Sequence, residues 1–236
     1  MNNPLTYLDP LLFAVLPYAV FFNFFIFTIH RYRTETFTYS TLGSQFLENR
    51  SHFWGMVPLH YGLIIVLAGH VVAFLIPRQI LLWNSRPLRL YVLEVSALIF
   101  GLLALVGLVA AIARRFNDVK VRQVTSLVDW IVYALLVVQV GTGVYVAVFH
   151  PWGSSWFAAS ATPYLWSLLK FSPDISFVAT MPFVVKLHIV NFYVLIGLFP
   201  FTRLVHILVT PNPYLWRKPQ VVRWYGRATP VTGGKD

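Results

Sequence analysis

Long apolar runs alternate with short polar stretches along this chain. A helix that crosses the hydrocarbon core of a membrane needs about 20 mostly apolar residues. Five runs reach that length, at about Leu11–Ile29, Phe53–Ile76, Leu88–Ala113, Val124–Phe149 and Met181–Val209. The stretches between them collect Pro, Gly, Ser and charged residues, and no repeat is visible. The pattern predicts an all-α integral membrane bundle of five transmembrane helices, formed by residues 1–236 as a single domain with a short polar tail from about residue 211.

The composition supports a membrane protein. Hydrophobic residues make up 58% of the chain and charged residues only 11%, whereas soluble domains carry about 25% charged residues. We therefore expect a multi-pass protein of the cell membrane, with the lipid bilayer as its surroundings. The chain has no Cys, which excludes disulfides, iron–sulfur ligation and covalent c-type haem attachment by this chain.

The positive charge is unevenly distributed between the connections. The net charge is +10, which in a soluble protein would suggest nucleic acid as a partner. In a membrane protein, basic connections set the orientation instead, so we expect no nucleic acid. Twelve of the 18 Lys and Arg residues lie in the first connection, the third connection and the tail, and four lie in the second and fourth connections. This imbalance predicts an outer N-terminus and a cytoplasmic C-terminus.

Four histidines lie inside the predicted spans, His60 and His70 on the second and His188 and His206 on the fifth. Polar groups in hydrocarbon are costly and need partners. Since the two helices run in opposite directions, His70 and His188 share the outer leaflet, and His60 and His206 share the inner one. Two facing neutral imidazoles are suited to be the axial ligands of one haem iron. The arrangement favours two haems b, and a transporter with a histidine proton relay remains the alternative.

The spacing of the two histidine pairs is unequal. The ten residues from His60 to His70 rise about 15 Å in a helix, and the eighteen from His188 to His206 rise about 27 Å. Helix tilt, helix bending and side-chain reach must absorb about 6 Å at each end. Pro58 removes one backbone hydrogen bond, and we expect it to bend the second helix near His60.

Three further polar residues lie close to these histidines. Arg203 is one turn from His206, where its guanidinium is suited to bind a haem propionate, or alternatively to reach the cytoplasmic headgroups. Lys186 has the corresponding position near His188. Asn191 is one turn from His188 and is a candidate either to orient the other ring nitrogen or to form a hydrogen bond between helices.

Two other groups of residues stand out. Gly55, Gly62 and Gly69 repeat every seven residues, and their angle around the helix favours close packing against a neighbouring helix over a haem groove. At the outer end of the third span, Glu94 lies near a group that is suited to bind a quinol head and accept its protons: Tyr91, Arg89 and Arg86. An ion pair of Glu94 with one of the two arginines is the alternative.

Four motifs carry a resemblance to a known family: HYGLIIVLAGH (60–70), RRFNDVKVRQVT (114–125), LVVQVGTG (136–143) and KLHIVNFYVLIGLFPFTRLVHI (186–207). The last fixes both histidines of the fifth span together with the PF-T-RLVH ending. The chain resembles the gamma subunit of membrane-bound respiratory nitrate reductases, a di-haem cytochrome b, from about residue 30 to 215.

The resemblance implies specific roles. It implies an outer haem b on His70 and His188 and an inner haem b on His60 and His206. It further implies oxidation of a membrane quinol near the outer haem, with a basic residue early in the third helix, closest to Arg89, linked to quinol binding. Electrons would pass to an iron–sulfur subunit and on to a molybdenum catalytic subunit. The same module serving another oxidoreductase, or running electrons to quinone, stays open, as does an anchor whose haems only hold the complex together.

Overall fold

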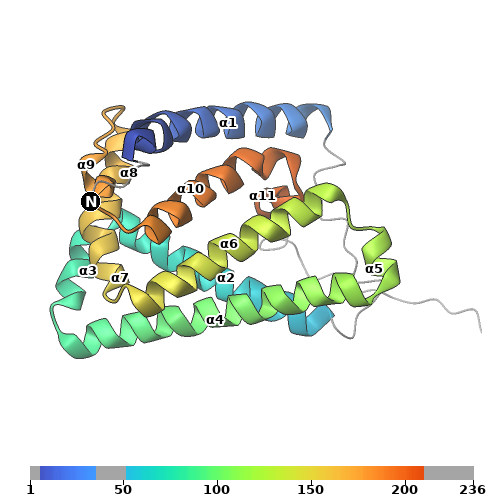
Figure 1. Ribbon diagram of the computed structural model, residues 1–236, viewed down its shortest axis with the longest axis horizontal. Coiled ribbons are helices and arrows are strands. Elements are labelled where there is room, and N and C mark those ends of the chain that lie inside the picture. The colour runs from blue at the N-terminus through green and yellow to red at the C-terminus, as the bar shows by residue number, and fades with distance from the viewer. Residues whose placement is uncertain (1–5, 36–51, 210–236) are drawn as a thin grey trace, which may run out of the picture.

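The computed structural model describes residues 6–35 and 52–209, and the secondary structure of this described part is helical (Figure 1). Its five longest helical stretches are long and apolar enough to cross a membrane: Leu11–Thr34, Phe53–Leu75, Pro87–Asn117, Leu127–Phe149 and Phe183–Phe201. They consist of η2 (Leu11–Val15) with α1 (Leu16–Thr34), α2 (His52–Leu75), α4 (Pro87–Asn117), α6 (Leu127–Phe149), and α10 (Phe183–Leu198) with η5 (Phe199–Phe201). The prediction of a five-span helical bundle is confirmed. The polar tail from residue 211 lies outside the described residues.

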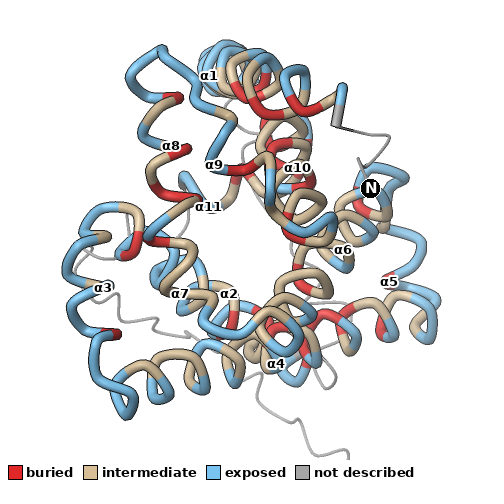
Figure 2. The backbone as a smooth tube through the Cα atoms, turned by 60° about the vertical axis from the view of Figure 1, so that its left-hand side comes forward, coloured by how far each residue is buried: buried red, intermediate tan, exposed pale blue. Residues whose placement is uncertain are grey.

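The spans pack in a row. α2 packs against α4, α4 against α6, α6 against α10 and α10 against α1, whereas α2 and α10 are not closely packed against each other. Figure 1 shows this order from α1 at the top to α4 at the bottom. Buried positions concentrate where neighbouring helices meet (Figure 2), and outward faces expose large apolar side chains such as Phe22, Ile64 and Val106. Such faces suit lipid and would cause aggregation in water.

Small residues bring α2 and α4 together. A Cβ atom added at Gly62 would lie 2.6 Å from the backbone nitrogen of Ala104, and one added at Gly107 would lie 2.3 Å from that of Leu59. Gly55 likewise faces the backbone of α4, whereas a Cβ at Gly69 would meet nothing within 4 Å. The expected close packing is therefore confirmed for Gly55 and Gly62 and does not extend to Gly69.

Short helices fill the connections that the sequence analysis treated as loops. They are α3 (Pro77–Asn84), α5 (Val119–Gln123), α7 (Gly153–Trp156), η4 (Phe157–Ala161), α8 (Thr162–Leu169) and α9 (Ser176–Ala179), with η1 (Thr6–Leu8) before the first span. α3, α7, α8 and α9 gather at one end of the bundle, which we call the α3 end (Figure 1). The opposite end, which carries α5, is the α5 end. These helices were missed because they are too short to produce a span-length apolar run.

The fifth span is interrupted before its second histidine, which corrects the prediction of one continuous segment over Met181–Val209. α10 ends at Leu198, and after η5 the backbone of Thr202 is extended (φ −115°, ψ 175°). The chain then resumes as η6 (Arg203–Val205) and α11 (His206–Val209). Pro200 is the physical reason, because its ring clashes with the preceding turn and it lacks an N–H group. α2, by contrast, continues through Pro58.

The interruption is stabilised from another span. Arg31, in the last turn of α1, donates from Nη1 to the carbonyl oxygens of Pro200 at 2.6 Å and Thr202 at 3.1 Å. The Thr202 hydroxyl accepts a hydrogen bond from the Leu204 amide at 3.2 Å and so begins the next turn. Because the chain leaves the straight helical path here, the eighteen-residue spacing no longer sets the height of His206.

Candidate functional site

His60 and His206 meet near the α5 end. His60 lies on α2 and His206 at the start of α11, and their ring centroids are 6.1 Å apart with an angle of 64° between the planes. Metal–imidazole bonds are about 2.0–2.1 Å, so two imidazoles on opposite sides of one metal place their centroids roughly 6 Å apart. The break after α10 is what brings these two rings to the same depth.

His70 and His188 lie toward the α3 end. His70 is one turn before the end of α2 and His188 is near the start of α10, and the two side chains are close enough to interact electrostatically. The edge of the Phe157 ring packs against His70 with centroids 5.1 Å apart at 86°. The η4 segment, which carries Phe157, therefore covers this end of α2.

Hydrogen bonds fix the tautomer of three of the four imidazoles. Nδ1 of His60 lies 2.7 Å from a backbone carbonyl oxygen, Nδ1 of His70 lies 2.8 Å from one, and Nδ1 of His206 lies 2.8 Å from one. A carbonyl oxygen can only accept a hydrogen bond, so each Nδ1 must carry the proton. Each ring therefore presents the unprotonated Nε2 as its free lone pair, which is the form that binds a metal.

His188 has side-chain partners instead. Its Nδ1 lies 3.0 Å from the Thr142 hydroxyl oxygen. That hydroxyl donates its own proton to the carbonyl oxygen of Val138 at 2.5 Å, so its oxygen accepts from His188. The Gln139 amide nitrogen lies 3.1 Å from Nε2 and 3.4 Å from Nδ1. An amide in line with the Nε2 lone pair would lie much farther from Nδ1, so Gln139 contacts the flank of the ring and leaves that lone pair free.

Asn191 contacts Gln139. Its amide donates to the Gln139 side-chain oxygen at 2.7 Å and to the carbonyl oxygen of Leu135 at 3.0 Å. It thus makes the hydrogen bond between helices that was the alternative to orienting His188. The sequence reasoning missed Thr142, which lies inside the motif LVVQVGTG but gives no signal of its own, since a Thr on a helix usually bonds its own backbone.

The two basic residues near the histidines each contact an aspartate. The Lys186 ammonium lies 2.6 Å from the carboxylate of Asp9, which follows η1. Nε of Arg203 lies 3.1 Å from the Asp129 carboxylate, and its Nη2 donates to the Val124 carbonyl at 3.1 Å. Asp129 also closes the capping box of α6. Both basic side chains therefore connect the histidine-bearing segments to other elements.

The candidate quinol residues lie at the α3 end. The Glu94 carboxylate accepts hydrogen bonds from the amides of Gly153 (3.2 Å) and Ser154 (2.8 Å) and from the Ser154 hydroxyl (2.6 Å). It thus holds the start of α7, directly after Trp152, whose φ of 66° is left-handed and unfavourable for a residue with a side chain. Its partners are these groups of α7 and not the alternative, an arginine.

The other members of this group are more exposed. The Tyr91 ring packs against Trp152 with centroids 5.4 Å apart. The Arg89 guanidinium lies over the Trp83 ring at 5.2 Å. Arg86 is the exposed N-cap residue of α4. All three therefore line the surface of the α3 end around α3 and the start of α4.

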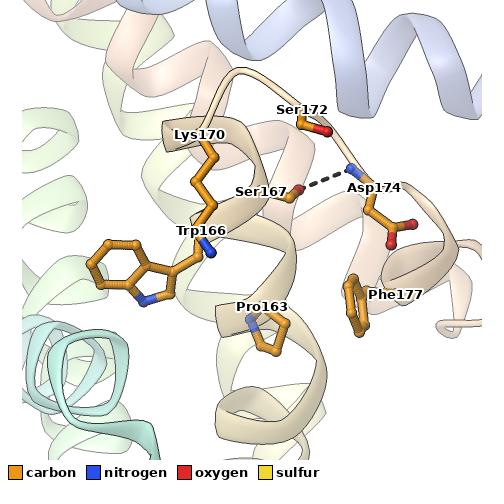
Figure 3. A pocket seen from close by; sticks show the side chains of 7 residues that line it. All are labelled: Pro163, Trp166, Ser167, Lys170, Ser172, Asp174 and Phe177. Atoms are coloured by element: carbon orange, nitrogen blue, oxygen red, sulfur yellow. Dashed lines mark hydrogen bonds between the residues drawn. The ribbon is translucent and has the colours of Figure 1, made fainter.

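A cleft of about 360 Å³ opens between α8 and α9 (Figure 3). Its lining is mixed in character and comprises Pro163, Trp166, Ser167, Lys170, Ser172, Asp174 and Phe177. The Asp174 amide donates to the Ser167 hydroxyl at 2.9 Å, the bond dashed in Figure 3. Hydrogen bonds from Ser176 hold the pKa of the exposed Asp174 carboxyl below its usual value. None of the four histidines lines this cleft.

The residues present fit a haem held by two axial imidazoles. Among the described residues there is no group of three or more His, Cys, Asp or Glu that would hold a metal ion by itself. Each location offers two imidazoles in the metal-binding tautomer, and α2 is not closely packed against the helix opposite it. An axial pair on a porphyrin iron needs only two protein ligands, because the macrocycle supplies the other four.

These features define a class: a multi-pass helical membrane protein with two pairs of intramembrane imidazoles. The comparisons give the family. The model of the nitrate reductase gamma subunit family matches residues 9–225, and the chain belongs to this family.

Individual relatives agree with this assignment. The chain is 33% identical over 217 residues to the nitrate reductase gamma chain of Bacillus subtilis (strain 168), covering 90% of this chain and 97% of that one. It is 29% identical over 223 residues to the respiratory nitrate reductase 2 gamma chain of Escherichia coli (strain K12), covering 92% and 97%. It also matches the nitrate reductase-like protein NarX of Mycobacterium tuberculosis at 26% identity, over 88% of this chain but 32% of that protein.

Proposed function

We propose that this chain is the membrane-anchoring di-haem cytochrome b subunit of a nitrate reductase-type complex, which transfers electrons from membrane quinol to a peripheral oxidoreductase. The observation that carries the proposal is the pairing of His60 with His206, whose ring centroids are 6.1 Å apart, together with the second pair, His70 and His188, ten residues along α2. Membership of the gamma subunit family supports the same reading.

The histidines would hold two haems b. His70 and His188 would bind one at the α3 end, and His60 and His206 the other at the α5 end. A bound haem b supplies reversible one-electron chemistry. The chain's part is to keep each Nε2 lone pair available, through the hydrogen bonds at Nδ1, and to surround both sites with apolar helices. Low polarity around a haem and hydrogen bonds to its ligands are the means by which a protein sets the haem potential.

Arg203 and Lys186 are our candidates for contacts with haem propionates. Arg203 lies three residues before His206, and Lys186 two before His188. Their ion pairs with Asp129 and Asp9 offset charges that would otherwise be buried alone. Asn191 would act less directly, through Gln139 on the His188 ring.

The distribution of Lys and Arg supports an orientation with the α3 end outside and the α5 end in the cytoplasm. In this orientation, quinol would be oxidised at the α3 end and its protons released outside. Arg89, Tyr91 and Arg86 would contact the quinol, and Glu94 would hold α7 beside them. The basic α5 end would contact an iron–sulfur subunit, which passes electrons to a molybdenum catalytic subunit.

Counting haems in histidine variants tests the proposal. We expect two haems b per polypeptide in the reduced-minus-oxidised spectrum of the purified wild-type chain. His70→Ala and His188→Ala should each remove the same one, and His60→Ala and His206→Ala should each remove the other. His150→Ala is the matched control, because His150 lies at the end of α6 next to Tyr145, and it should retain both.

The alternatives give different results. A colourless purified protein would contradict the proposal and favour a histidine proton relay. Haems that bind with the expected grouping but are not reduced by a quinol analogue would contradict electron transfer from quinol and leave only an anchoring role. Any other grouping of haem loss among the four variants would contradict the pairing of the histidines.

A further inference from the structure

His188 differs from the other three imidazoles in what holds its Nδ1 proton. In the other three, the acceptor is a backbone carbonyl of the residue's own helix or turn, which no side-chain substitution removes. The acceptor for His188 is the hydroxyl of Thr142, on the neighbouring helix α6. The orientation of this one ring therefore depends on a replaceable side chain.

Thr142 is oriented to accept. Its hydroxyl donates to the Val138 carbonyl one turn earlier, at 2.5 Å, which directs an oxygen lone pair toward His188. The next residue, Gly143, makes room for the ring, because a Cβ atom there would lie only 3.1 Å from Cε1 of His188. The two adjacent positions together form a seat for the imidazole on α6.

Gln139 and Asn191 complete the contacts. The Gln139 amide lies against the flank of the His188 ring, 3.1 Å and 3.4 Å from its two nitrogens. Asn191, buried on α10, accounts for the other end of that amide by donating to its oxygen at 2.7 Å. The ring is thus held at its Nδ1 edge by a hydroxyl and on its flank by an amide whose own position is fixed.

We propose that Thr142 is a positioning residue that sets the electron donation and the ring orientation of His188, and thereby the reduction potential of the haem held by His70 and His188. This inference rests on the proposed function. A hydrogen bond from the remote N–H of a ligating imidazole makes the ring a stronger donor to the metal, which favours ferric over ferrous iron. Removing the acceptor raises the potential of that haem and leaves the other unchanged.

The test compares three variants of the full-length chain, purified with its haems. In Thr142→Val the acceptor is lost at nearly constant volume, and we expect a roughly tenfold shift of one haem toward the reduced form, which is about 59 mV for a one-electron couple. The ferric low-spin EPR signal of the same haem should shift, since it depends on the angle between the two ligand rings. Thr142→Ser keeps the hydroxyl and should restore both values.

The matched control is Thr28→Val. Thr28 lies on α1, and its buried hydroxyl has no hydrogen-bond partner, so the same chemical change there should alter neither haem. The haem that shifts in Thr142→Val should be the one lost in His188→Ala.

Two results would overturn the inference while leaving the di-haem function intact. One is a Thr142→Val chain with both haems at wild-type potentials and with unchanged EPR signals. The other, which covers loss of the haem from Thr142→Val, is a Thr142→Ser chain that shifts or loses the haem to the same extent. Absence of two haems from the wild-type chain would instead refute the proposed function, whatever the Thr142 variants do.

Discussion

At the scale of single residues, the charges inside the bundle connect elements that are far apart in the sequence. The ion pair of Lys186 with Asp9 joins α10 to the segment before the first span, and both side chains are largely buried, at 14% and 7% exposed. The Lys186 ammonium also lies 6.0 Å from the centre of the Phe13 ring. Burying two charges is costly, so the pair stabilises the fold only while both partners are present.

Lys186→Met should therefore destabilise the purified protein by about 3 kcal/mol, because it leaves the Asp9 carboxylate buried without its cation. The double variant Asp9→Leu/Lys186→Met removes both charges and should recover most of the loss. Thermal unfolding in detergent measures both effects. A double variant no more stable than Lys186→Met would show that the side chain of Lys186, and not its charge, is what stabilises this contact.

The sequence identifies residues of the site only where their chemistry is rare in a span. Histidine in an apolar helix is such a case, so His60, His70, His188 and His206 were found from spacing. Thr142 was not, because a threonine is common in such a helix and its partner lies 46 positions away. Which of several hydroxyls faces an imidazole depends on how α6 is rotated against α10, and the sequence of neither helix specifies that angle.

At the scale of elements, α8 is tied to two spans by a pair of tyrosines. The Tyr164 hydroxyl donates to the Phe13 carbonyl at 2.8 Å, so the Tyr193 hydroxyl on α10, 2.9 Å away, donates to Tyr164. Both rings are fully buried. Burial, and secondarily the neighbouring Tyr193, raise the pKa of Tyr164 above its ordinary value.

Tyr164→Phe should lower the stability by about 1–3 kcal/mol, because two buried groups lose a partner. The raised pKa also gives a pH dependence. The folded state keeps Tyr164 neutral, so its contribution is fully present below the ordinary value of 10.0 and declines as the pH rises above it. The wild-type unfolding temperature should thus fall more steeply above pH 10 than that of Tyr164→Phe. Tyr61→Phe, on an exposed face of α2, is the control and should change neither value.

The contact between α2 and α4 gives a second prediction at this scale. Gly107→Ala should cost about 1–3 kcal/mol, because the new Cβ would meet the backbone nitrogen of Leu59 at 2.3 Å and the helices must separate. Gly101→Ala on the same helix meets only a Val144 methyl at 3.5 Å and should be tolerated. Unfolding temperatures of the two variants decide it, and equal values would mean that the helices separate at no cost.

The elements themselves were predictable to different degrees. Long apolar runs located all five spans, because the bilayer fixes the length of a spanning helix. The interruption after Leu198 was not foreseen, although Pro200 marks it, because proline is tolerated within transmembrane helices and α2 does continue through Pro58. The difference lies in tertiary contacts: Arg31 binds the freed carbonyl oxygens of Pro200 and Thr202.

At the scale of the whole molecule, the row of spans leaves α2 and α10 unpacked against each other while each packs against other helices. α4 and α6 connect the two sides, so the distance between the histidine-bearing segments is set by helices that carry none of the four ligands. The two imidazole pairs then lie at different depths along one axis. This arrangement suits a one-dimensional electron path from the α3 end to the α5 end.

The direction of that path follows from the orientation of the bundle in the membrane. The excess of Lys and Arg in the first and third connections and in the tail places the α5 end in the cytoplasm. The chain contains no cysteine, so single cysteines can be introduced without removing native ones. Ser172→Cys lies in the connection between α8 and α9 at the α3 end, and Lys120→Cys lies on α5; both positions are exposed.

In intact cells, a membrane-impermeant maleimide should label Ser172→Cys and leave Lys120→Cys unlabelled until the cells are lysed. The reverse pattern would place the quinol-facing histidine pair, His70 and His188, on the cytoplasmic side. Because the haem counts of the His→Ala variants do not depend on orientation, that outcome would reverse the side of proton release while leaving the two axial pairs unaffected.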